Sequence, residues 1–290
     1  MFKLSPGEKL FSVFNYILLA LLALAALYPF WYVAAASLSS GQAVVQGKVW
    51  IWPVEPNLSA YTKVVHYQGI WMAYANTVFY TAAGTLVNLA MTTAGAYPLS
   101  KKRLLLRKPV NMFITFAMLF NAGMIPVYLN YRNLHLDNSR IGILIGFAIS
   151  TFYVFVLRSF FSSIPEEMEE AARMDGAGGA RILLQIYLPL AKPALVALGL
   201  FYAVGRWNGY FWTMVLLRDE NKIPLQVLLN KLIVQMSASQ EMIGLADVQS
   251  VSVETVIYAT IMVAILPIVA VYPLLQKYFM QGVMIGSVKG

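Results

Sequence analysis

The chain of 290 residues contains no cysteine and only two histidines, His66 and His135, far apart in the sequence. The absence of cysteine excludes a disulfide framework, a thiol nucleophile and any metal site built on thiolates. Two isolated histidines offer little for a metal site built on imidazole. We therefore predict that this chain binds no metal and no cofactor of its own.

Charge is scarce as well. Only 12% of the residues are charged and 59% are hydrophobic, with a mean hydropathy of +0.66, whereas a soluble domain carries about 25% charged residues. This composition excludes an ordinary soluble enzyme, a disordered tail and a nucleic-acid binder. The net charge of +8 does not change that conclusion, because excess lysine and arginine are typical of cytoplasmic loops in membrane proteins. The composition predicts a polytopic membrane protein.

Six apolar stretches are long enough to cross a bilayer, which takes about 20 residues in a helix. They cover residues 13–36, 71–98, 110–130, 141–161, 194–217 and 256–275. The first run has 24 residues, longer than the roughly 7–15 apolar residues of a signal peptide, so we expect it to be retained. The sequence predicts an all-α fold with six transmembrane helices in one membrane domain over residues 1–290.

The basic residues predict the orientation of these helices. The connection 100–109 carries five positive charges and no acid. With both termini inside, 13 lysines and arginines face the cytoplasm, seven face outward, and Arg206 is left within a span. The positive-inside bias therefore predicts an N-in, C-in topology. Of the long outer loops 38–70 and 218–255, the second contains an apolar stretch after Pro224 that predicts an amphipathic helix.

The loop between the fourth and fifth spans has the most specific pattern. Ser163 is a candidate helix N-cap, Pro165 suits a first turn, and four glutamates follow that complement the helix dipole. The pair Asp175-Gly176 predicts the end of this helix, because glycine tolerates positive φ. A second amphipathic stretch then runs over residues 180–189. By pattern alone, an ordinary acidic surface helix is an equally good interpretation.

A family resemblance decides between these interpretations. Glu170-Ala171-Ala172, three residues, Gly176, nine residues, Ile186, one residue and Leu188-Pro189 match the EAA motif of ABC-importer permeases at every spacing. The resemblance extends over essentially the whole chain and is similar to the carbohydrate-importer branch with MalG-type subunits. The segment 274–290 and the pair Trp207-Asn208 resemble the subgroup that imports oligosaccharides and polysaccharide fragments, which includes alginate-oligosaccharide importers.

The resemblance implies a function and a set of partners. In this family the EAA loop, here residues 164–189, forms a coupling helix seated in a cleft of a separate ATPase. Glu170 would accept hydrogen bonds that hold the loop in shape; alternatively, it is a purely solvated glutamate. The partners would be a second homologous permease, two ATP-binding cassette subunits that use ATP-Mg, an extracytoplasmic solute-binding protein and the oligosaccharide, in a bacterial inner membrane. The coupling residues carried over by position are Glu170, Ala171, Ala172, Asp175 and Gly176.

The chain itself has no recognisable site for ATP. A P-loop needs two glycines separated by four residues and followed by lysine and serine or threonine. The nearest approximation, from Gly41 to Gly47-Lys48, has five intervening residues and is followed by Val49. We therefore predict that the chain is not an enzyme and that ATP hydrolysis belongs to the partner subunits.

The arginine within the fifth predicted span is a candidate pathway residue, because burying its charge costs at least about 2.5–3.5 kcal/mol. Aromatic rings stack on sugars, while amide and guanidinium groups bind hydroxyls or carboxylates. The candidate substrate-pathway residues are Arg206, Trp207, Asn208, Tyr210 and Trp212. Alternatively, the arginine pairs with backbone or with an acid of a partner, and the aromatic residues form an interfacial belt. Both interpretations remain open.

Other polar residues in the spans have two interpretations as well. Asn88, Thr92 and Thr93 in the second span and Asn121 in the third either line the pathway or join helices by hydrogen bonds. An ion-coupled secondary transporter would need an acidic residue in a span, but every Asp and Glu lies outside the six stretches. A scaffold or channel without ATP coupling would leave the EAA match unexplained. The prediction is therefore a permease subunit of an ATP-driven, binding-protein-dependent importer of oligosaccharides, including acidic ones such as alginate fragments.

Overall fold

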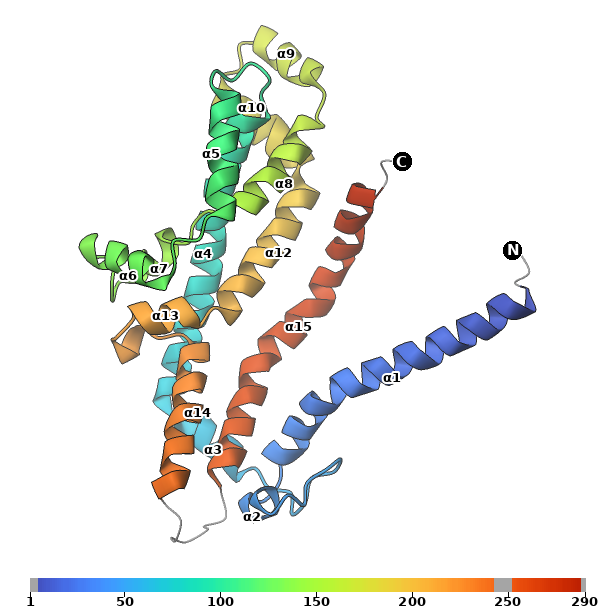
Figure 1. Ribbon diagram of the computed structural model, residues 1–290, viewed down its shortest axis with the longest axis vertical. Coiled ribbons are helices and arrows are strands. Elements are labelled where there is room, and N and C mark those ends of the chain that lie inside the picture. Colours follow the sequence, from blue (N-terminus) through green and yellow to red (C-terminus); the bar gives the residue numbers. More distant parts are fainter. Residues whose placement is uncertain (1–4, 243–251, 288–290) are drawn as a thin grey trace. The chain divides into compact units, whose positions relative to one another are not determined.

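The computed structural model describes residues 5–242 and 252–287, with side chains up to residue 234 and from 252 to 270. All regular secondary structure in these residues is helical (Figure 1), which confirms the predicted all-α class. Segment 274–290, which carries part of the family resemblance, and the loop residues 243–251 lie outside the residues whose side chains are described. Contacts group the described residues into two compact units, one within Met1–Ile70 and Leu229–Leu266 and the other within Trp71–Leu228 and Pro267–Gly290.

The helices follow one another with short connections. The first half of the chain contains α1 (Pro6–Ser37), α2 (Gly41–Val45), α3 (Ser59–His66), α4 (Gln68–Ser100), α5 (Arg107–Leu119), α6 (Met124–Asn133) and α7 (Arg140–Ile145). The second half contains α8 (Thr151–Ser162), α9 (Glu166–Met174), α10 (Gly179–Ile182), the π-helical turn η1 (Leu183–Tyr187), α11 (Leu188–Leu190), α12 (Lys192–Asn208), α13 (Phe211–Leu216), α14 (Leu225–Met242) and α15 (Val253–Ser287). The helix predicted after Pro224 is α14.

The first unit contains the long apolar helix α1. Its start is fixed by a capping box, in which the Ser5 hydroxyl accepts from the Glu8 amide and the Glu8 carboxylate accepts from the Ser5 amide. None of its most apolar stretch is buried against the rest of the chain, as expected for a helix that lipid or another subunit covers. Only its end joins a small core, where Ala35 and Ala36 pack against Val44.

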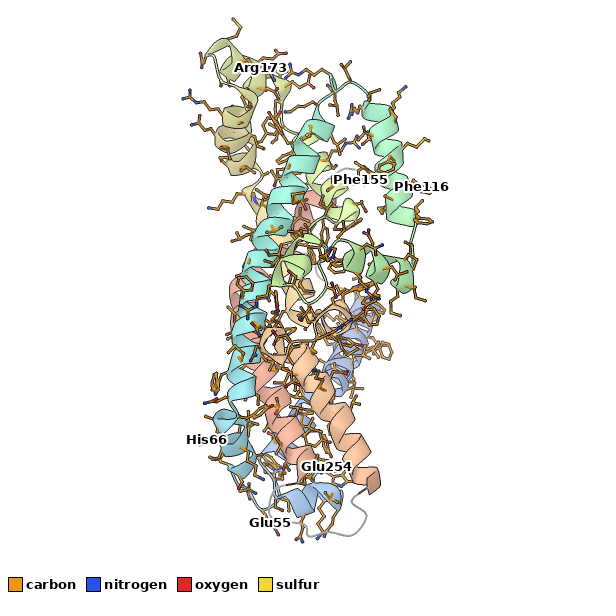
Figure 2. All side chains as sticks on the ribbon, turned by 90° about the vertical axis from the view of Figure 1, so that its left-hand side faces the viewer. Glu55, His66, Phe116, Phe155, Arg173 and Glu254 are labelled. Atoms are coloured by element: carbon orange, nitrogen blue, oxygen red, sulfur yellow. The ribbon has the colours of Figure 1, made fainter. Side chains whose placement is uncertain are left out.

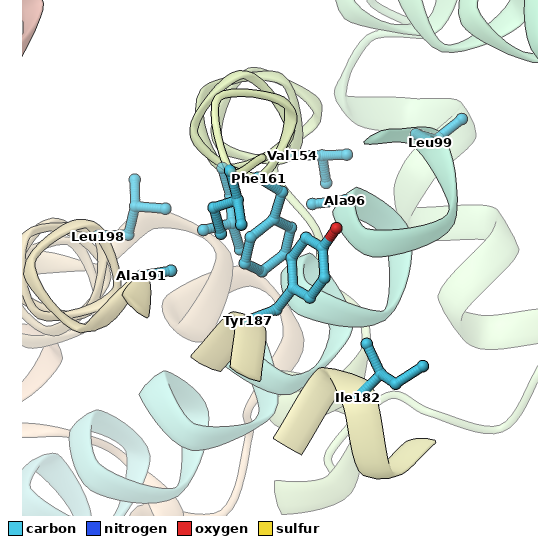
Figure 3. Close-up of a cluster of buried hydrophobic side chains, with 10 residues drawn as sticks. Ala96, Leu99, Val154, Phe161, Ile182, Tyr187, Ala191 and Leu198 are labelled. Carbon is cyan, nitrogen blue, oxygen red and sulfur yellow. The ribbon is translucent and has the colours of Figure 1, made fainter. Parts of the chain in front are cut away.

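The second unit has its core where α4, α8, η1 and α12 meet (Figure 3). Phe161 on α8 and Tyr187 in η1 lie edge to face, with ring centroids 5.5 Å apart, and Tyr97 on α4 packs the same way on Tyr187 at 5.1 Å. Such edge-to-face pairs stabilise aromatic cores beyond simple burial. This core fixes the ends of the helices from which α9 projects.

Three of the six predicted spans are not single helices. The stretch 110–130 is divided between α5 and α6, whose axes differ by 114°. The stretch 141–161 is interrupted between α7 and α8, and 194–217 between α12 and α13. Among the described residues, α1 and the segment Val253–Ala270 are long and apolar enough to cross a membrane, and two bent helix pairs also meet that test. The count of six spans and the N-in, C-in orientation therefore stay predictions.

Candidate functional site

The predicted coupling segment forms the short helix α9. The sequence predicted Ser163 as the N-cap of this helix, and that prediction is wrong. Ser163 is the C-cap of α8, and its hydroxyl donates to the Phe160 carbonyl at 2.7 Å. Pro165 occupies the N-cap position instead. The glutamates of the first turn, which include Glu166 and Glu169, complement the positive end of the helix dipole.

The helix ends at the predicted place. Gly176 has φ +78°, and a Cβ added to it would meet no atom within 4 Å. The backbone conformation alone therefore favours glycine here. The amide of Ala177 donates back to the Ala172 carbonyl at 2.9 Å, and that of Asp175 to Ala171 at 3.1 Å, which closes the helix end. The predicted second stretch follows as α10, η1 and α11.

A buried carboxylate anchors α9 to the rest of the unit. Only 3% of the Glu169 surface is exposed. The carboxylate accepts hydrogen bonds from Lys101, Arg103, Arg173 and the Tyr187 hydroxyl, the last two at 3.0 Å. Burial alone would raise the pKa of Glu169, but the hydrogen bonds from Lys101, Tyr187 and Arg173 outweigh it and lower the pKa to about 2. This carboxylate joins the loop that follows α4, α9 itself and η1.

Most of the predicted coupling residues lie on the exposed surface of α9 and of the turn that follows it. Four of them are exposed, namely Glu170, Ala171, Asp175 and Gly176, whereas Ala172 packs against the core. The Glu170 carboxylate makes no hydrogen bond among the described residues, as in the solvated alternative, and the buried Glu169 makes the contacts that hold α9; the coupling role of Glu170 stays a prediction. The anchoring role of Glu169 could have been predicted from its spacing to Arg173, because an acid and a base four residues apart can pair across one helical turn.

Arg206 on α12 donates hydrogen bonds to the end of α7 and to the loop between α7 and α8, where the predicted fourth span is interrupted. Its Nε donates to the Asn88 Oδ1 at 2.9 Å and its Nη1 to the Ile143 carbonyl at 2.6 Å. Its Nη2 donates to the carbonyls of Leu144 at 3.1 Å and Phe147 at 3.0 Å. A helix end inside a membrane protein leaves such carbonyls without partners. The guanidinium supplies the missing donors.

Two polar residues of α4 complete the support of this break. The Asn88 Nδ2 donates to the carbonyls of Phe147 at 2.7 Å and Ala148 at 2.9 Å. Thr92 shares a hydrogen bond of 2.6 Å with the Tyr202 hydroxyl, which accepts from the Ser150 amide at 3.3 Å. Asn88 and Thr92 therefore join neighbouring segments by hydrogen bonds, the second of the two roles considered from the sequence, and Asn88 also lines a cavity of this unit.

Four of the five predicted pathway residues line one cavity of about 480 Å³: Arg206, Asn208, Tyr210 and Trp212. Its wall is largely aromatic and includes Phe147, Phe201 and Phe211. Trp207 lies elsewhere, buried edge to face against Tyr74 with ring centroids 6.0 Å apart. The structure thus brings most of the predicted set together, and their contact with sugar stays a prediction.

Comparison with known proteins defines the class. The family model described as "binding-protein-dependent transport system inner membrane component" matches residues 67–285. The chain belongs to this family of ABC-importer permeases. It is accordingly an inner-membrane subunit and not an enzyme, since ATP is hydrolysed by a separate subunit. This confirms the predicted class and sets aside the ion-coupled secondary transporter.

Individual relatives cover nearly the whole chain. It is 36% identical to the polygalacturonan/rhamnogalacturonan transport system permease protein YtcP of Bacillus subtilis, over 98% of this chain and 99% of that one. It is 25% identical to the lactose transport system permease protein LacG of Rhizobium radiobacter, over 97% and 98%. A chain in the crystal structure of a bacterial ABC transporter involved in the import of the acidic polysaccharide alginate is 47% identical, covering 96% and 100%, with a TM-score of 0.88.

Proposed function

We propose that this chain is one of two permease subunits in an ATP-driven importer of uronate-containing oligosaccharides. The observation that carries the proposal is its 47% identity, over 96% of its length, to a chain of an alginate importer. The relative at 36% identity is described as transporting polygalacturonan, another uronate polymer. The relative described for the neutral sugar lactose is only 25% identical.

The arrangement of α9 supports a coupling role for residues 164–189. One side of this helix is held by the buried Glu169, while Glu170 and Asp175 on the other side face outward. A short helix fixed to its own subunit on one side and free on the other can follow a partner as a rigid body, because packed helices shift as units. We assign the outward side to the cleft of the ATPase, in the cytoplasm, in an N-in, C-in topology of six spans.

The complete importer then contains this chain, a second permease, two ATP-binding cassette subunits and an extracytoplasmic binding protein. ATP-Mg is bound by the cassette subunits. The aromatic cavity of about 480 Å³ forms part of the pathway. Tyr210 and Trp212 would stack on sugar rings and Asn208 would bind hydroxyls. Arg206, with four of its five N–H groups already donated, would shape the wall and make it positive.

The experiment is to express the chain with its neighbouring subunits, purify the complex and measure ATP hydrolysis with the binding protein present. Oligogalacturonates and oligoalginates are compared with neutral maltooligosaccharides of the same length. Co-elution of an ATPase, and stimulation by the uronate oligomers only, is the expected result. Stimulation by the neutral oligomers alone would overturn the substrate class, and the lack of any co-eluting ATPase would overturn the coupling assignment.

A further inference from the structure

The basic residues of segment 101–108, which covers the loop after α4 and the start of α5, form two groups in the structure. Lys101 and Arg103 pair with the buried Glu169, and the Lys102 Nζ lies 3.3 Å from a Glu166 carboxylate oxygen. All three therefore hold α9. The other two basic residues, at positions 107 and 108, have no acidic partner in the part of the chain that the structure describes. The loop carries more positive charge than its own unit neutralises.

A third cation lies near Arg107. Arg158 on α8 donates from Nη1 to the Asn111 Oδ1 of α5 at 2.9 Å. Asn111 comes one helical turn after Arg107, so these two residues share a face of α5, and Arg158 is within electrostatic reach of Arg107. The Nε of Arg107 is buried and has no hydrogen-bond acceptor among the described residues. Like charges and a buried donor without an acceptor are costly unless an anion lies between them.

Arg107 lines a polar cavity together with glutamates of α9, but the outward surface beside these cations is apolar. Leu105 and Leu106, just before α5, are 86% and 73% exposed. Farther along α5, Phe113 and Phe116 are 71% and 61% exposed. Phe155 on the adjacent α8 (Figure 2) lies under the Arg158 guanidinium, 5.8 Å from its ring centroid. This arrangement fits a lipid, because the cations would lie beside its headgroup and the apolar surface beside its acyl chains.

We propose that Arg107, Lys108 and Arg158 bind the headgroup phosphate of an anionic phospholipid, whose acyl chains lie along the exposed face of α5. Guanidinium groups bind phosphate through paired hydrogen bonds, and the phosphate would give the buried Nε its acceptor. Clusters of basic residues at the cytoplasmic ends of membrane helices are a recurrent form of such sites. The inference depends on the proposed function only for placing this end of α5 at the cytoplasmic face.

The test uses the complete importer in nanodiscs of mixed phosphatidylcholine and phosphatidylglycerol, with retained lipids counted by native mass spectrometry. The double variant Arg107→Gln/Arg158→Gln should retain roughly tenfold less phosphatidylglycerol, because charge-assisted hydrogen bonds are lost. Arg132→Gln is the matched control, since this exposed arginine on α6 has no ion pair within the described ranges. Equal retention by the double variant and the wild type, or an equal loss in the control, would overturn the proposal.

Two further arms separate the other anions that these cations could bind. Displacement of the lipid by millimolar inorganic phosphate would show a site for free phosphate, which contradicts the proposal. Loss of the ATPase from the double variant, with lipid retention unchanged, would show that the cations contact that subunit instead. Lipid retention is also measured on the membrane subunits without the ATPase, so a failure of the coupling assignment leaves this test intact.

Discussion

At the scale of single residues, the buried carboxylate of Glu169 and the guanidinium of Arg206 each satisfy several partners from different helices. Glu169 has four partners: two in the loop after α4, one on α9 and one in η1. Arg206 has four acceptors on α4, on α7 and in the loop after α7. Because one side chain serves several elements in each case, we expect single substitutions there to act on whole elements.

Replacing Glu169 by glutamine should loosen α9. The amide keeps the shape of the carboxylate but removes the charge that neutralises Lys101, Arg103 and Arg173. We expect a loss of about 1–3 kcal/mol in local stability, since two of the cations are half exposed. Transport per ATP hydrolysed in proteoliposomes should fall. Glu167→Gln, an exposed carboxylate on the same helix, is the control, and an equal fall in both variants would contradict the anchoring role.

The same carboxylate predicts a pH dependence. The pKa of Glu169 in the folded chain is about 2, below the ordinary pKa of a glutamate. The ionised carboxylate therefore stabilises α9 fully at any pH above that ordinary pKa, and this stabilisation is lost as the pH falls toward 2. A fluorophore on Met174→Cys, unique in a chain without cysteine, should report no change between pH 8 and 5 and a transition below about pH 4.5. The transition should be absent in Glu169→Gln; its persistence there would assign it to another group.

Arg206→Gln should act mainly on assembly. The glutamine side chain offers two N–H donors for the carbonyls that the guanidinium now serves, so buried acceptors near Phe147 lose their partners. We expect less assembled complex and parallel losses in uptake of neutral and acidic oligosaccharides. The measurement is uptake of both kinds of oligosaccharide per cell, together with the amount of assembled complex. A loss confined to the acidic oligosaccharides would show that Arg206 contacts the substrate carboxylate directly.

At the scale of elements, the break between α7 and α8 depends on room made by α4. A Cβ added to Gly84 would lie 2.8 Å from the Arg206 Nε, closer than real Cβ contacts allow. We expect Gly84→Ala to displace the guanidinium and lower the thermal unfolding temperature of the purified complex by several degrees. Gly95→Ala in the same helix would meet only Val154 at 3.6 Å, an ordinary contact, and should leave that temperature unchanged. Equal effects would contradict the steric explanation.

At the scale of the whole molecule, we expect that substitutions at α9 impair coupling to the ATPase without impairing insertion into the membrane. Gly176→Pro cannot keep φ at +78°, because proline fixes φ near −65°, and Glu170→Lys reverses an exposed charge on the proposed ATPase contact. Both variants should reach the membrane in normal amounts and fail to retain the ATPase on purification. Gly178→Ala is the control, since its φ of −74° and open surroundings tolerate alanine. Normal uptake by both variants would remove α9 from the coupling mechanism.

The sequence by itself determined the class of this protein. Apolar runs and scarce charge required a helical membrane protein, since backbone groups in lipid must be satisfied within the chain. The spacing from Glu170 to Pro189 identified the family, and Gly176 marked the end of α9 because its backbone conformation is a local property.

Only the tertiary structure decided how those helices are broken and held. Hydropathy registers apolar side chains and not whether a helix continues, so it could not show that the spans 110–130, 141–161 and 194–217 are interrupted. The break after α7 exists because Arg206 and Asn88, distant in sequence, supply donors to its free carbonyls. Glu169 is buried beside the exposed Glu170 for a similar reason: two of its partners, Lys101 and Arg103, come from a loop that lies 68 and 66 residues earlier in the sequence. Local pattern does not contain such long-range contacts.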